Sequence, residues 1–396
     1  MKNLKYKPLT QFANLLNGYA FKSKNYVNSG IRVIRIANVQ DGYISDEKPC
    51  FYPLDTVEDI SKYILRENDF LVSLTGNVGR VALLTEDFLP AALNQRVSCI
   101  RIKDENLLPK FLFYYFLRKQ FQKDCINASQ GVAQLNLSTK WLEQYPIPVL
   151  SIEEQNRVVA RIEELFSELD NGVETLKKTK QQLAVYRQAV LKEAFENCKP
   201  LSSIRDMSTL VTSGSRGWAQ FYASEGAKFI RIGNLTRDSI DIDFSDTQYV
   251  NLPDKAEGLR SKLQPNDVLV SITADLGSIG LVPNNIGEAY INQHIAVVRF
   301  KNVSQGKFMA WYLRSDWGQK DLLKNKRGAG KLGLGLDDIR DSRVPVVSDE
   351  EADAVLDIIE SRLSVCDSIE ETVDTALQQA EAMRQSILKK AFEGEL

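Results

Sequence analysis

The sequence predicts an α+β protein that arose by tandem duplication, in which a mixed, β-rich globular domain followed by a long helix occurs twice. Between Glu153 and Glu196 the apolar residues alternate at spacings of four and three over about five heptads, which indicates one long helix with a single apolar seam. The same stretch returns 197 positions later with a weaker seam. Because a helix with one apolar stripe needs a partner to bury it, we expect the two helices to form an antiparallel coiled coil with pseudo-twofold symmetry.

The repeat also extends through the globular blocks, where the same segments occur in the same order. The matching segments are Ile34–Val39 with Ile230–Leu235, Asn68–Thr75 with Asn266–Thr273, Asn94–Gln95 with Asn292–Gln293, Ile147–Val149 with Val344–Val346, and Arg187–Glu196 with Arg384–Glu393. We therefore expect a globular domain at 1–150, a long helix at 151–198, a second globular domain at 199–348 and a second long helix at 349–396.

The order of these parts predicts the direction of the helices. The first helix leads from the first domain to the second, so the second helix can pack on its twin only by running back antiparallel. This would place the two domains at opposite ends of a rod of about 60 Å, given about 40 helical residues with a rise of roughly 1.5 Å each. Gly172 lies in the first seam, where it could bend the helix.

Short runs rich in β-branched residues, separated by turn signals, predict the strands of the first domain. We expect strands at 31–36, 70–74, 81–84 and 97–102, followed by a helical region from Pro109. Pro146-Ile147-Pro148 is expected to stop regular structure, and Ser151 to cap the long helix that follows. The second domain should repeat this order of elements.

Length and composition exclude several classes of protein. With 396 residues, 43% of them hydrophobic, the chain can build two or three domains with cores of their own. No apolar run approaches the roughly 20 residues of a membrane span, and the first residues lack the apolar core of a signal peptide, so we expect a cytoplasmic protein without membrane contact. Five widely spaced cysteines predict reduced, mostly buried thiols.

The net charge of −2 hides an uneven distribution. The stretch from Asp349 to the end carries a net charge of −9 and the first long helix −2, which leaves +9 on the two globular blocks. A nucleic acid could therefore be held by the blocks and not by the helices. The same distribution of charge fits equally well a protein whose long helices simply carry solvated glutamates, with no nucleic acid bound.

The motifs of a self-contained enzyme are absent from the sequence. There is no Pro-Pro pair of the kind that amino-methyltransferases place around a flipped base, and Pro253-Asp254 lacks the acid-x-Lys follower of a nuclease. His294 is the only histidine, which argues against a histidine-based triad or metal site. The glycine-rich run 328–335 lacks the spacing of a phosphate-binding loop. We expect no catalytic residue, metal site or cofactor in this chain.

Basic and small polar residues at strand ends and in loops are the candidates for contact with DNA. The set is Lys22, Lys24, Arg35, Arg80, Arg96, Ser129, Gln130, Lys140, Ser213, Ser215, Arg216, Trp218, Arg231, His294, Lys326, Arg327 and Lys331. For the loop with Lys326, Arg327 and Lys331, where glycines would let backbone amides approach phosphates, the alternative is an ordinary solvated loop.

Comparison of the two copies ranks these candidates. Arg35 and Arg231 lie on matching strands, and the fold explains their duplication as well as function does. Asn94-Gln95 and Asn292-Gln293 could hydrogen-bond to adenine edges. However, two domains that recognise different DNA sequences should carry different residues where they contact the bases. A structural turn is therefore favoured for both pairs. Divergent positions are better candidates for specificity, namely Lys22 against Trp218 and Arg96 against His294, although His294 also fits a polar groove residue.

The duplicated set of motifs resembles the specificity subunit of bacterial and archaeal type I restriction-modification enzymes, over essentially the whole chain. The resemblance rests on Ile230–Asn234, the Asn-Asp-x-Leu-Val-Ser strands, Pro146–Pro148 followed by Ile152–Gln155, and the terminal Ala391–Leu396. The second copy departs from the pattern at 349–354, where Ala352 replaces the usual glutamine, which affects the expected local contacts of the second helix.

The resemblance implies a non-enzymatic subunit in which each globular domain is a target recognition domain for one half of a split, asymmetric site on double-stranded DNA. The paired helices would fix the unread spacer and dock two methyltransferase subunits, which would flip an adenine and use S-adenosylmethionine. Restriction subunits would add ATP- and Mg²⁺-dependent nuclease activity, so these cofactors are expected on partner subunits and none in this chain.

Two other functions compete with this interpretation. One is a scaffold whose rod holds protein partners without reading DNA, and the other is a self-contained methylase or nuclease, against which the missing motifs argue. Replacing Lys326, Arg327 and Lys331 should weaken DNA binding and flatten its salt dependence in a DNA reader, and should have no such effect in a scaffold.

Overall fold

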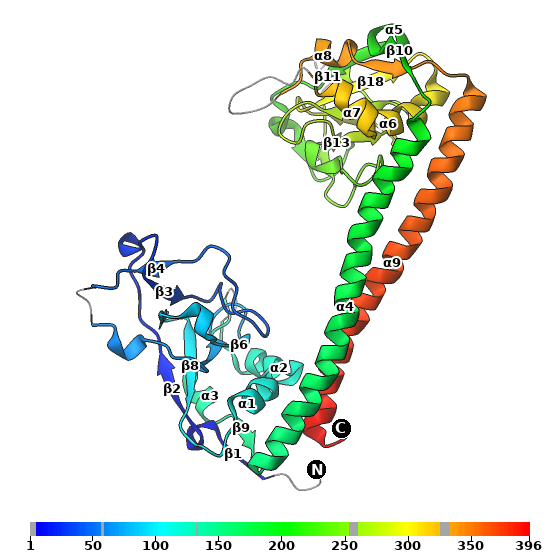
Figure 1. Cartoon of the computed structure of the whole chain (residues 1–396). Helices are drawn as coiled ribbons and strands as arrows, with labels where there is room; N and C mark the ends of the chain where they lie inside the picture. Colours follow the sequence, from blue (N-terminus) through cyan, green and yellow to red (C-terminus); the bar gives the residue numbers. More distant parts are fainter. Residues whose placement is uncertain (1–4, 57–58, 132–133, 253–259, 325–332) are drawn as a thin grey trace. The chain divides into compact units, whose positions relative to one another are not determined.

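The computed structural model describes residues 5–56, 59–131, 134–252, 260–324 and 333–396 (Figure 1). The chain divides into two compact units, which we call unit 1 (residues 1–176 and 375–396) and unit 2 (residues 177–374). Each unit contains one globular domain and parts of both long helices. The long helices are α4 (Ile152–Phe195) and α9 (Asp349–Glu393), and the first matches the periodic stretch Glu153–Glu196 within one residue at each end.

The globular part of unit 1 contains two larger sheets and one small one. The main sheet is antiparallel with strand order β2-β8-β5-β6, and the second has order β4-β3-β7 with β3 and β7 parallel. The strands are β1 (Tyr6–Pro8), β2 (Ala13–Asn17), β3 (Ile31–Ile34), β4 (Phe51–Tyr52), β5 (Phe70–Ser73), β6 (Val81–Leu83), β7 (Ala91–Leu93), β8 (Val97–Ile102) and β9 (Pro146–Pro148). The helices before α4 are α1 (Pro109–Phe116), α2 (Lys119–Ala128) and α3 (Thr139–Glu143).

Unit 2 repeats this architecture with one additional strand. Its main sheet has order β11-β18-β15-β16 and its second sheet β12-β14-β13-β17, again with one parallel pair, β13 and β17. The strands are β10 (Pro200–Ser203), β11 (Ser208–Ser213), β12 (Tyr222–Ala223), β13 (Ala227–Ile230), β14 (Gln248–Val250), β15 (Val268–Ser271), β16 (Ile279–Leu281), β17 (Ala289–Ile291), β18 (Ile295–Phe300) and β19 (Arg343–Pro345). The helices are α5 (Ile204–Met207), α6 (Gly306–Arg314), α7 (Asp316–Leu322) and α8 (Leu336–Arg340).

The matching sheet orders confirm the predicted tandem duplication. Strand for strand, β2-β8-β5-β6 corresponds to β11-β18-β15-β16, and the register agrees, since Leu71 pairs with Cys99 where Leu269 pairs with Val297. The turn before the central strand is also repeated, because Asn68 and Asn266 both have a positive φ, +64° and +63°. Asparagine tolerates this left-handed conformation better than most residues, which explains why it recurs.

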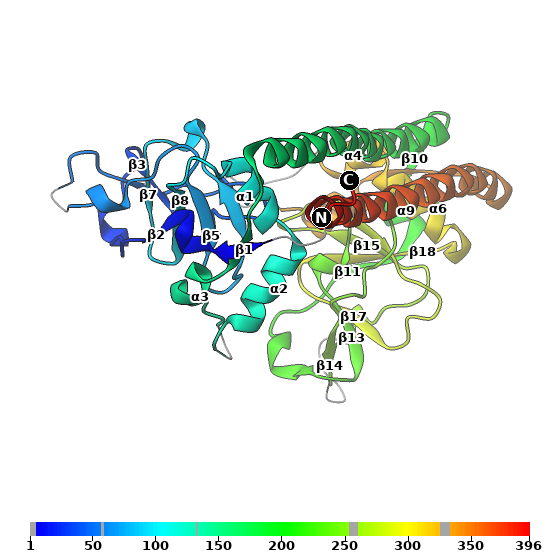
Figure 2. The ribbon, with the colours of Figure 1, turned by 90° about the horizontal axis from the view of Figure 1, so that it is seen from below.

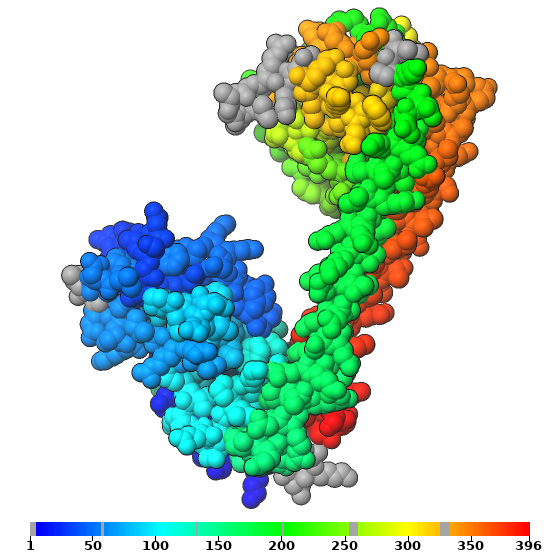
Figure 3. All heavy atoms as spheres, in the orientation of Figure 1, coloured from blue at the N-terminus to red at the C-terminus, as the bar shows by residue number. Residues whose placement is uncertain are grey.

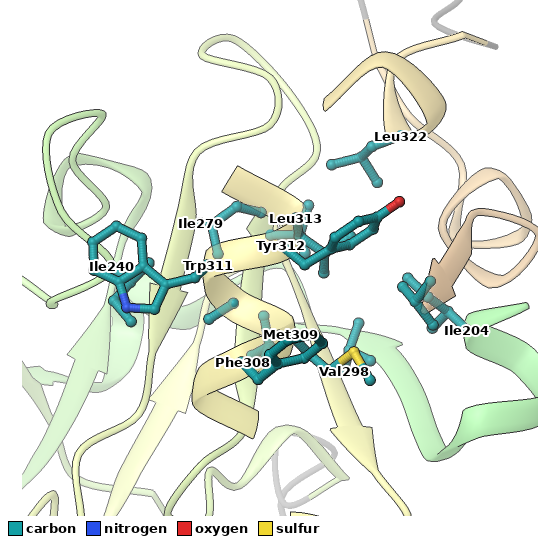
Figure 4. Packing of buried hydrophobic residues seen from close by; sticks show 14 of the residues in the cluster. Ile204, Ile240, Ile279, Val298, Phe308, Met309, Trp311, Tyr312, Leu313 and Leu322 are labelled. Carbon is teal, nitrogen blue, oxygen red and sulfur yellow. The ribbon is translucent and has the colours of Figure 1, made fainter. Parts of the chain in front are cut away.

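Each main core lies between the four-stranded sheet, the first helix after it and the two long helices. In unit 2, α6 carries Phe308, Met309, Tyr312 and Leu313 into this core, as Figure 4 shows. The end of α4 closes the core, with the Phe195 ring 5.4 Å from both Phe308 and Tyr312. In unit 1 the end of α9 does the same with Phe392. Phe195 and Phe392 each fill the core of one globular domain, which explains why the sequences at the ends of the two long helices are so similar.

The two long helices pack antiparallel within each unit, side by side in Figures 1 and 2. In unit 2 the ion pairs Lys180 to Asp374 (2.8 Å) and Arg187 to Glu370 (2.9 Å) set the direction, because residue numbers rise on α4 as they fall on α9. In unit 1, Arg384 of α9 pairs with Asp170 of α4. Solvent screens ion pairs at the surface, so these pairs specify the register of the two helices more than they stabilise the helix pair.

One expectation about local structure needs correction. Pro146-Ile147-Pro148 does not stop regular structure but forms β9, which pairs with β1, because an edge of a two-stranded ladder tolerates proline. The five cysteines are free thiols as expected, three buried and two half-buried. Gly172 lies within the continuous helix α4, where an added Cβ would meet no atom within 4 Å.

The replacement of glutamine by Ala352 leaves the corresponding contact in place. In unit 1, buried Gln155 of α4 accepts from the Leu108 amide (2.9 Å) and donates to the Asn106 (2.7 Å) and Leu150 (3.0 Å) carbonyls. In unit 2, Gln305 reaches the base of α9 from the loop before α6 and donates to the Val347 carbonyl at 3.0 Å. The glutamine lies on the long helix in unit 1 and just before α6 in unit 2, but in both units it links the start of the long helix to the segment before the first helix that follows the main sheet.

Candidate nucleic-acid interface

One edge of the main sheet in unit 2 forms a polar pocket of about 760 Å³. Its lining is Ser213, Gly214, Ser215, Arg216, Arg260, Thr273, Gln293 and His294. Four of the predicted contact residues, Ser213, Ser215, Arg216 and His294, therefore come together. Among the described residues, the lining contains two arginines and no acidic side chain, which suits an anionic ligand.

The sheet topology explains why these residues meet. Ser213 ends β11, His294 immediately precedes β18, and Thr273 follows β15. β18 runs antiparallel to both of its neighbours, β11 and β15. The end of β11, the start of β18 and the end of β15 therefore lie together at one edge of the sheet, where the strands end. Gly214 passes so close to β17 that an added Cβ would lie 2.0 Å from the Ile291 carbonyl oxygen, so only glycine fits there.

Hydrogen bonds link the floor of the pocket. The His294 ring contacts Thr273 Oγ1 through Nδ1 (2.7 Å) and the Gln293 side-chain amide through Nε2 (2.8 Å). The His294 backbone is held from both sides, because its N–H donates to Asn292 Oδ1 (3.0 Å) and its carbonyl accepts from the Ile272 amide (2.9 Å). At the rim, Arg260 Nη2 lies 3.5 Å from Ser215 Oγ.

Unit 1 presents the corresponding residues at the same edge of its own main sheet. Thr75 follows β5, and exposed Gln95 and Arg96 precede β8, with the Arg96 carbonyl accepting from Leu74 at 3.0 Å. Gly18 lies close to the Asn94 backbone, where a Cβ would approach to 2.2 Å. Lys62 occupies the position of Arg260 in the chain order. The chemistry of the edge is thus repeated, with different side chains beside the shared glutamine.

Three predicted arginines have their side chains engaged within the fold. Arg231 forms an ion pair with Asp246 (2.9 Å), and Arg35 donates to the Lys48 carbonyl (2.9 Å). Arg80 donates to Gln40 Oε1 at 2.8 Å. These bonds favour the fold explanation for the duplicated pair Arg35 and Arg231.

The remaining predicted residues lie at several places. Trp218 is 5% exposed and stacks on Phe229 with ring centroids 4.7 Å apart, so it supports the neighbouring loop from inside rather than offering a ring face to a base. Lys22 and Lys24 are exposed around a short 3₁₀ turn, and Lys140 is exposed on α3. Ser129 caps α2 and donates to the Cys125 carbonyl (2.6 Å), while Gln130 pairs with Asn136. Lys326, Arg327 and Lys331 lie outside the described residues.

Sequence reasoning missed Arg260, Lys62 and Thr273 and gave Gln293 a structural role. The structural turn is confirmed for Asn94 and Asn292, because each side-chain oxygen accepts a hydrogen bond from the backbone N–H two residues later. Gln293 instead turns its amide into the pocket. The signal for Lys62 and Arg260 was their matching position in the two copies, which a search for motifs did not use.

A second pair of sites lies where each globular domain meets the long helices. We call them cleft 1 (in unit 1, about 990 Å³) and cleft 2 (in unit 2, about 810 Å³). Parts of their linings correspond across the repeat. The matched pairs are Glu163 with Glu360, Ser167 with Ser364, Asp170 with Asp367, Arg384 with Arg187, Gln385 with Gln188, and Tyr114 with Trp311.

The two clefts differ from the polar pocket in the charge of their linings. Each cleft lining contains one more acidic than basic side chain. Many of the cations are already paired, as in Arg187 with Asp367 (2.7 Å) and Lys307 with Glu360 (2.5 Å). In cleft 1, burial and the nearby Glu163 carboxylate raise the pKa of Tyr114 to about 12. These clefts therefore offer no attraction to a polyanion and suit a protein surface.

Cleft 2 also contains polar groups that lack partners. Trp311 Nε1 and Arg314 Nε are buried and form no hydrogen bond among the described residues. Figure 4 shows Trp311 beside Ile240, on the side of α6 opposite Tyr312. Burial lowers the pKa of Arg314, which Asp238 partly offsets. Buried donors without acceptors are costly, so an acceptor on a docked partner would stabilise them.

Neither a metal-binding group of side chains nor a membrane-spanning helix occurs in the described ranges. Within them, no three His, Cys, Asp or Glu side chains are grouped so that they could hold a metal ion. No described helix combines the length and apolar character needed to cross a bilayer.

A duplicated fold with a polar, cation-bearing sheet edge in each copy defines a two-domain DNA-recognition protein. The chain belongs to the type I restriction modification DNA specificity domain family, whose model matches residues 1–184 and 203–379. It is 27% identical to the type I restriction enzyme EcoBI specificity subunit of Escherichia coli over 416 residues, covering 97% of this chain and 84% of the relative. It is also 33% identical to the EcoAI specificity subunit of Escherichia coli over 178 residues, covering 43% and 30%.

Solved structures of related fold cover the whole chain. A structure described as showing complex assembly and conformational transition of the type I R-M system matches with a TM-score of 0.72 and 17% identity, over 100% of this chain and 99% of that one. The HsdS subunit of Thermoanaerobacter tengcongensis matches with a TM-score of 0.51 and 17% identity, over 100% and 98%. At this identity the likeness shows the fold. With the family, it makes the chain a non-catalytic DNA-recognition subunit of a type I restriction-modification system.

Proposed function

We propose that units 1 and 2 each read one half of a bipartite, asymmetric DNA site, while the paired helices set the unread spacer. The observation that carries this proposal is the polar sheet edge, which occurs once in each unit with shared geometry and different side chains. Shared geometry suits the common task of binding a duplex. Different side chains at the same positions, Arg96 and His294, suit two different half-sites.

The chemistry of the pocket in unit 2 fits both parts of DNA recognition. Arg216 and Arg260 supply the cations that neutralise phosphates. Ser213, Thr273 and Gln293 supply neutral donors and acceptors of the kind that read base edges. Placing these groups on strand ends held by hydrogen bonds gives a rigid reading surface.

The two clefts support docking of two copies of one protein partner. Parts of their linings match across the repeat, so a partner that fits one should fit the other. The family points to methyltransferase subunits in this role, with restriction subunits joining the assembly. S-adenosylmethionine, ATP and Mg²⁺ would then be bound by those partners, and the assembly would work on DNA in the cytoplasm.

The charge of the pocket gives a direct test. The variant Arg216→Ala/Arg260→Ala should bind a random-sequence duplex about 3- to 10-fold more weakly, and the slope of log affinity against log salt should fall by about 1 to 2. Filter binding of the full chain across a salt series measures both quantities.

The matched control is Lys301→Ala, which removes an exposed cation just beyond the other end of β18. It should leave both quantities nearly unchanged. Equal effects of the two variants would mean that only the total charge matters, and no effect of either would favour a scaffold that binds proteins alone.

A further inference from the structure

We infer that Gln293, clamped by His294, reads an adenine of the half-site that unit 2 recognises. The inference rests on the proposed function, because it requires the polar pocket to face base edges. It goes further by naming the reading residue, the base and the atoms involved. Gln293 is half-buried in the pocket lining, and its side-chain amide lies 2.8 Å from His294 Nε2.

The contact between the two side chains fits one arrangement of donors and acceptors. The Gln293 atom facing the ring is the amide nitrogen Nε2, which can only donate. In this arrangement His294 Nε2 is the acceptor of the bond. The other ring nitrogen, Nδ1, lies 2.7 Å from Thr273 Oγ1 and donates to it.

This arrangement determines what Gln293 can offer to a base. One of its two amide N–H groups is committed to His294. The groups that remain are one N–H donor and the Oε1 acceptor, side by side on the planar amide. In the major groove, adenine presents the complementary pair, an N7 acceptor beside an N6 donor.

The clamp also discriminates against guanine. Guanine presents two acceptors, N7 and O6, to the major groove. A glutamine with a freely rotating amide could turn both N–H groups toward them. In Gln293 the second N–H is held by the ring, so a guanine O6 would face the Oε1 acceptor. His294 thus acts as a positioning residue for the reading amide.

The support beneath the clamp is rigid. The His294 amide donates to Asn292 Oδ1, and its carbonyl accepts from the amide of Ile272, which directly follows the adjacent strand β15. Asn292 itself is 8% exposed. A reader fixed by its neighbours loses little side-chain freedom on binding, which favours a sharp base preference.

Unit 1 contains the same glutamine in a different setting. Gln95 is exposed, and Arg96 stands where unit 2 has His294. No imidazole can clamp Gln95, since the chain has only one histidine. The identity of the two glutamines is therefore compatible with two half-sites, because the neighbouring residue sets how each amide is presented.

The test begins with the wild-type assembly and its mapped methylation motif. Competition binding of the methyltransferase assembly is then measured on duplexes that vary each base pair of the two half-sites. Gln293→Ala should lose about a tenfold preference for adenine at one position of one half-site, other than the methylated adenine. His294→Ala should admit guanine at that same position, and His294→Gln, which restores an acceptor for the amide, should recover part of the preference.

A modified base changes the DNA and tests the contact in the wild-type assembly itself. Replacing that adenine by 7-deaza-adenine removes the N7 acceptor and keeps the base pair, so it should weaken wild-type binding about tenfold and leave Gln293→Ala unaffected. Melting curves check that each variant is folded.

The outcomes separate the inference from the function on which it rests. A wild-type assembly with no bipartite motif would overturn the proposed function itself. A normal wild-type motif, with folded variants that keep the same preference at every position, would overturn the role of Gln293. A preference that changes in both half-sites, or a deaza effect that persists in Gln293→Ala, would overturn it as well.

Discussion

At the scale of single residues, the most strongly repeated motifs build the fold, whereas the divergent pair Arg96 and His294 lies at the proposed reading edge. Asp69 of the Asn-Asp motif is 2% exposed and pairs with Arg101 through bonds of 2.8 and 2.5 Å. Its counterpart Asp267 pairs in the same way with Arg299. A buried carboxylate needs such a partner, which fixes both residues in both copies. Repetition in this chain therefore marks structure more often than recognition.

The glutamine that moved between helix and loop gives a prediction at this scale. Gln155→Ala should lower the free energy of unfolding of unit 1 by about 2–4 kcal/mol, because it leaves a buried amide and two carbonyls without partners. Hydrogen exchange at the Leu108 amide should accelerate with it.

Gln305→Ala in unit 2 is the matched comparison. It should cost less, about 1–2 kcal/mol, because Asp349, the other acceptor of Gln305, also accepts from Asn302. Unchanged protection of Leu108 in Gln155→Ala would contradict the structural role given to this glutamine.

At the scale of elements, each globular domain is closed by two helix segments that come from different repeats. The start of α4 and the end of α9 complete the core of unit 1, through Ile162 and Leu388 among others. The end of α4 and the start of α9 complete unit 2, through Leu191 and Ile359. Figure 3 shows the two helices packed against each other without a visible gap between their side chains over much of their length. The clefts lie on these composite surfaces, so folding of the helix pair also builds the proposed docking sites.

Filling one cleft at a time tests this arrangement. Ser167→Trp should obstruct cleft 1 and Ser364→Trp cleft 2, because both serines are exposed on the helix surface that lines each cleft. Each single variant should bind one methyltransferase subunit instead of two, and the double variant none. Native mass spectrometry of the assembly counts the subunits.

Ser361→Trp is the control, since Ser361 is exposed on the same helix outside the cleft lining. It should leave two subunits bound. Two bound subunits in the double cleft variant would show that the partner docks elsewhere.

At the scale of the whole molecule, the sequence was sufficient for the architecture and only partly sufficient for the site. The seam of α4 predicted its bounds within one residue because helical periodicity is a local signal. Arg260 and Thr273 were missed because only the strand order brings them to Ser213, which is distant in sequence. The clefts were missed for the same reason, since their linings combine residues of α1 or α6 with residues of both long helices.

The most direct test of the account is a genome-wide map of N6-methyladenine in the host strain, with and without this gene. The account predicts that deletion removes one bipartite, asymmetric motif and that restoring the gene returns it. An unchanged map, in a strain whose partner methyltransferase is expressed and active, would contradict the assignment of this chain as the subunit that selects the DNA site.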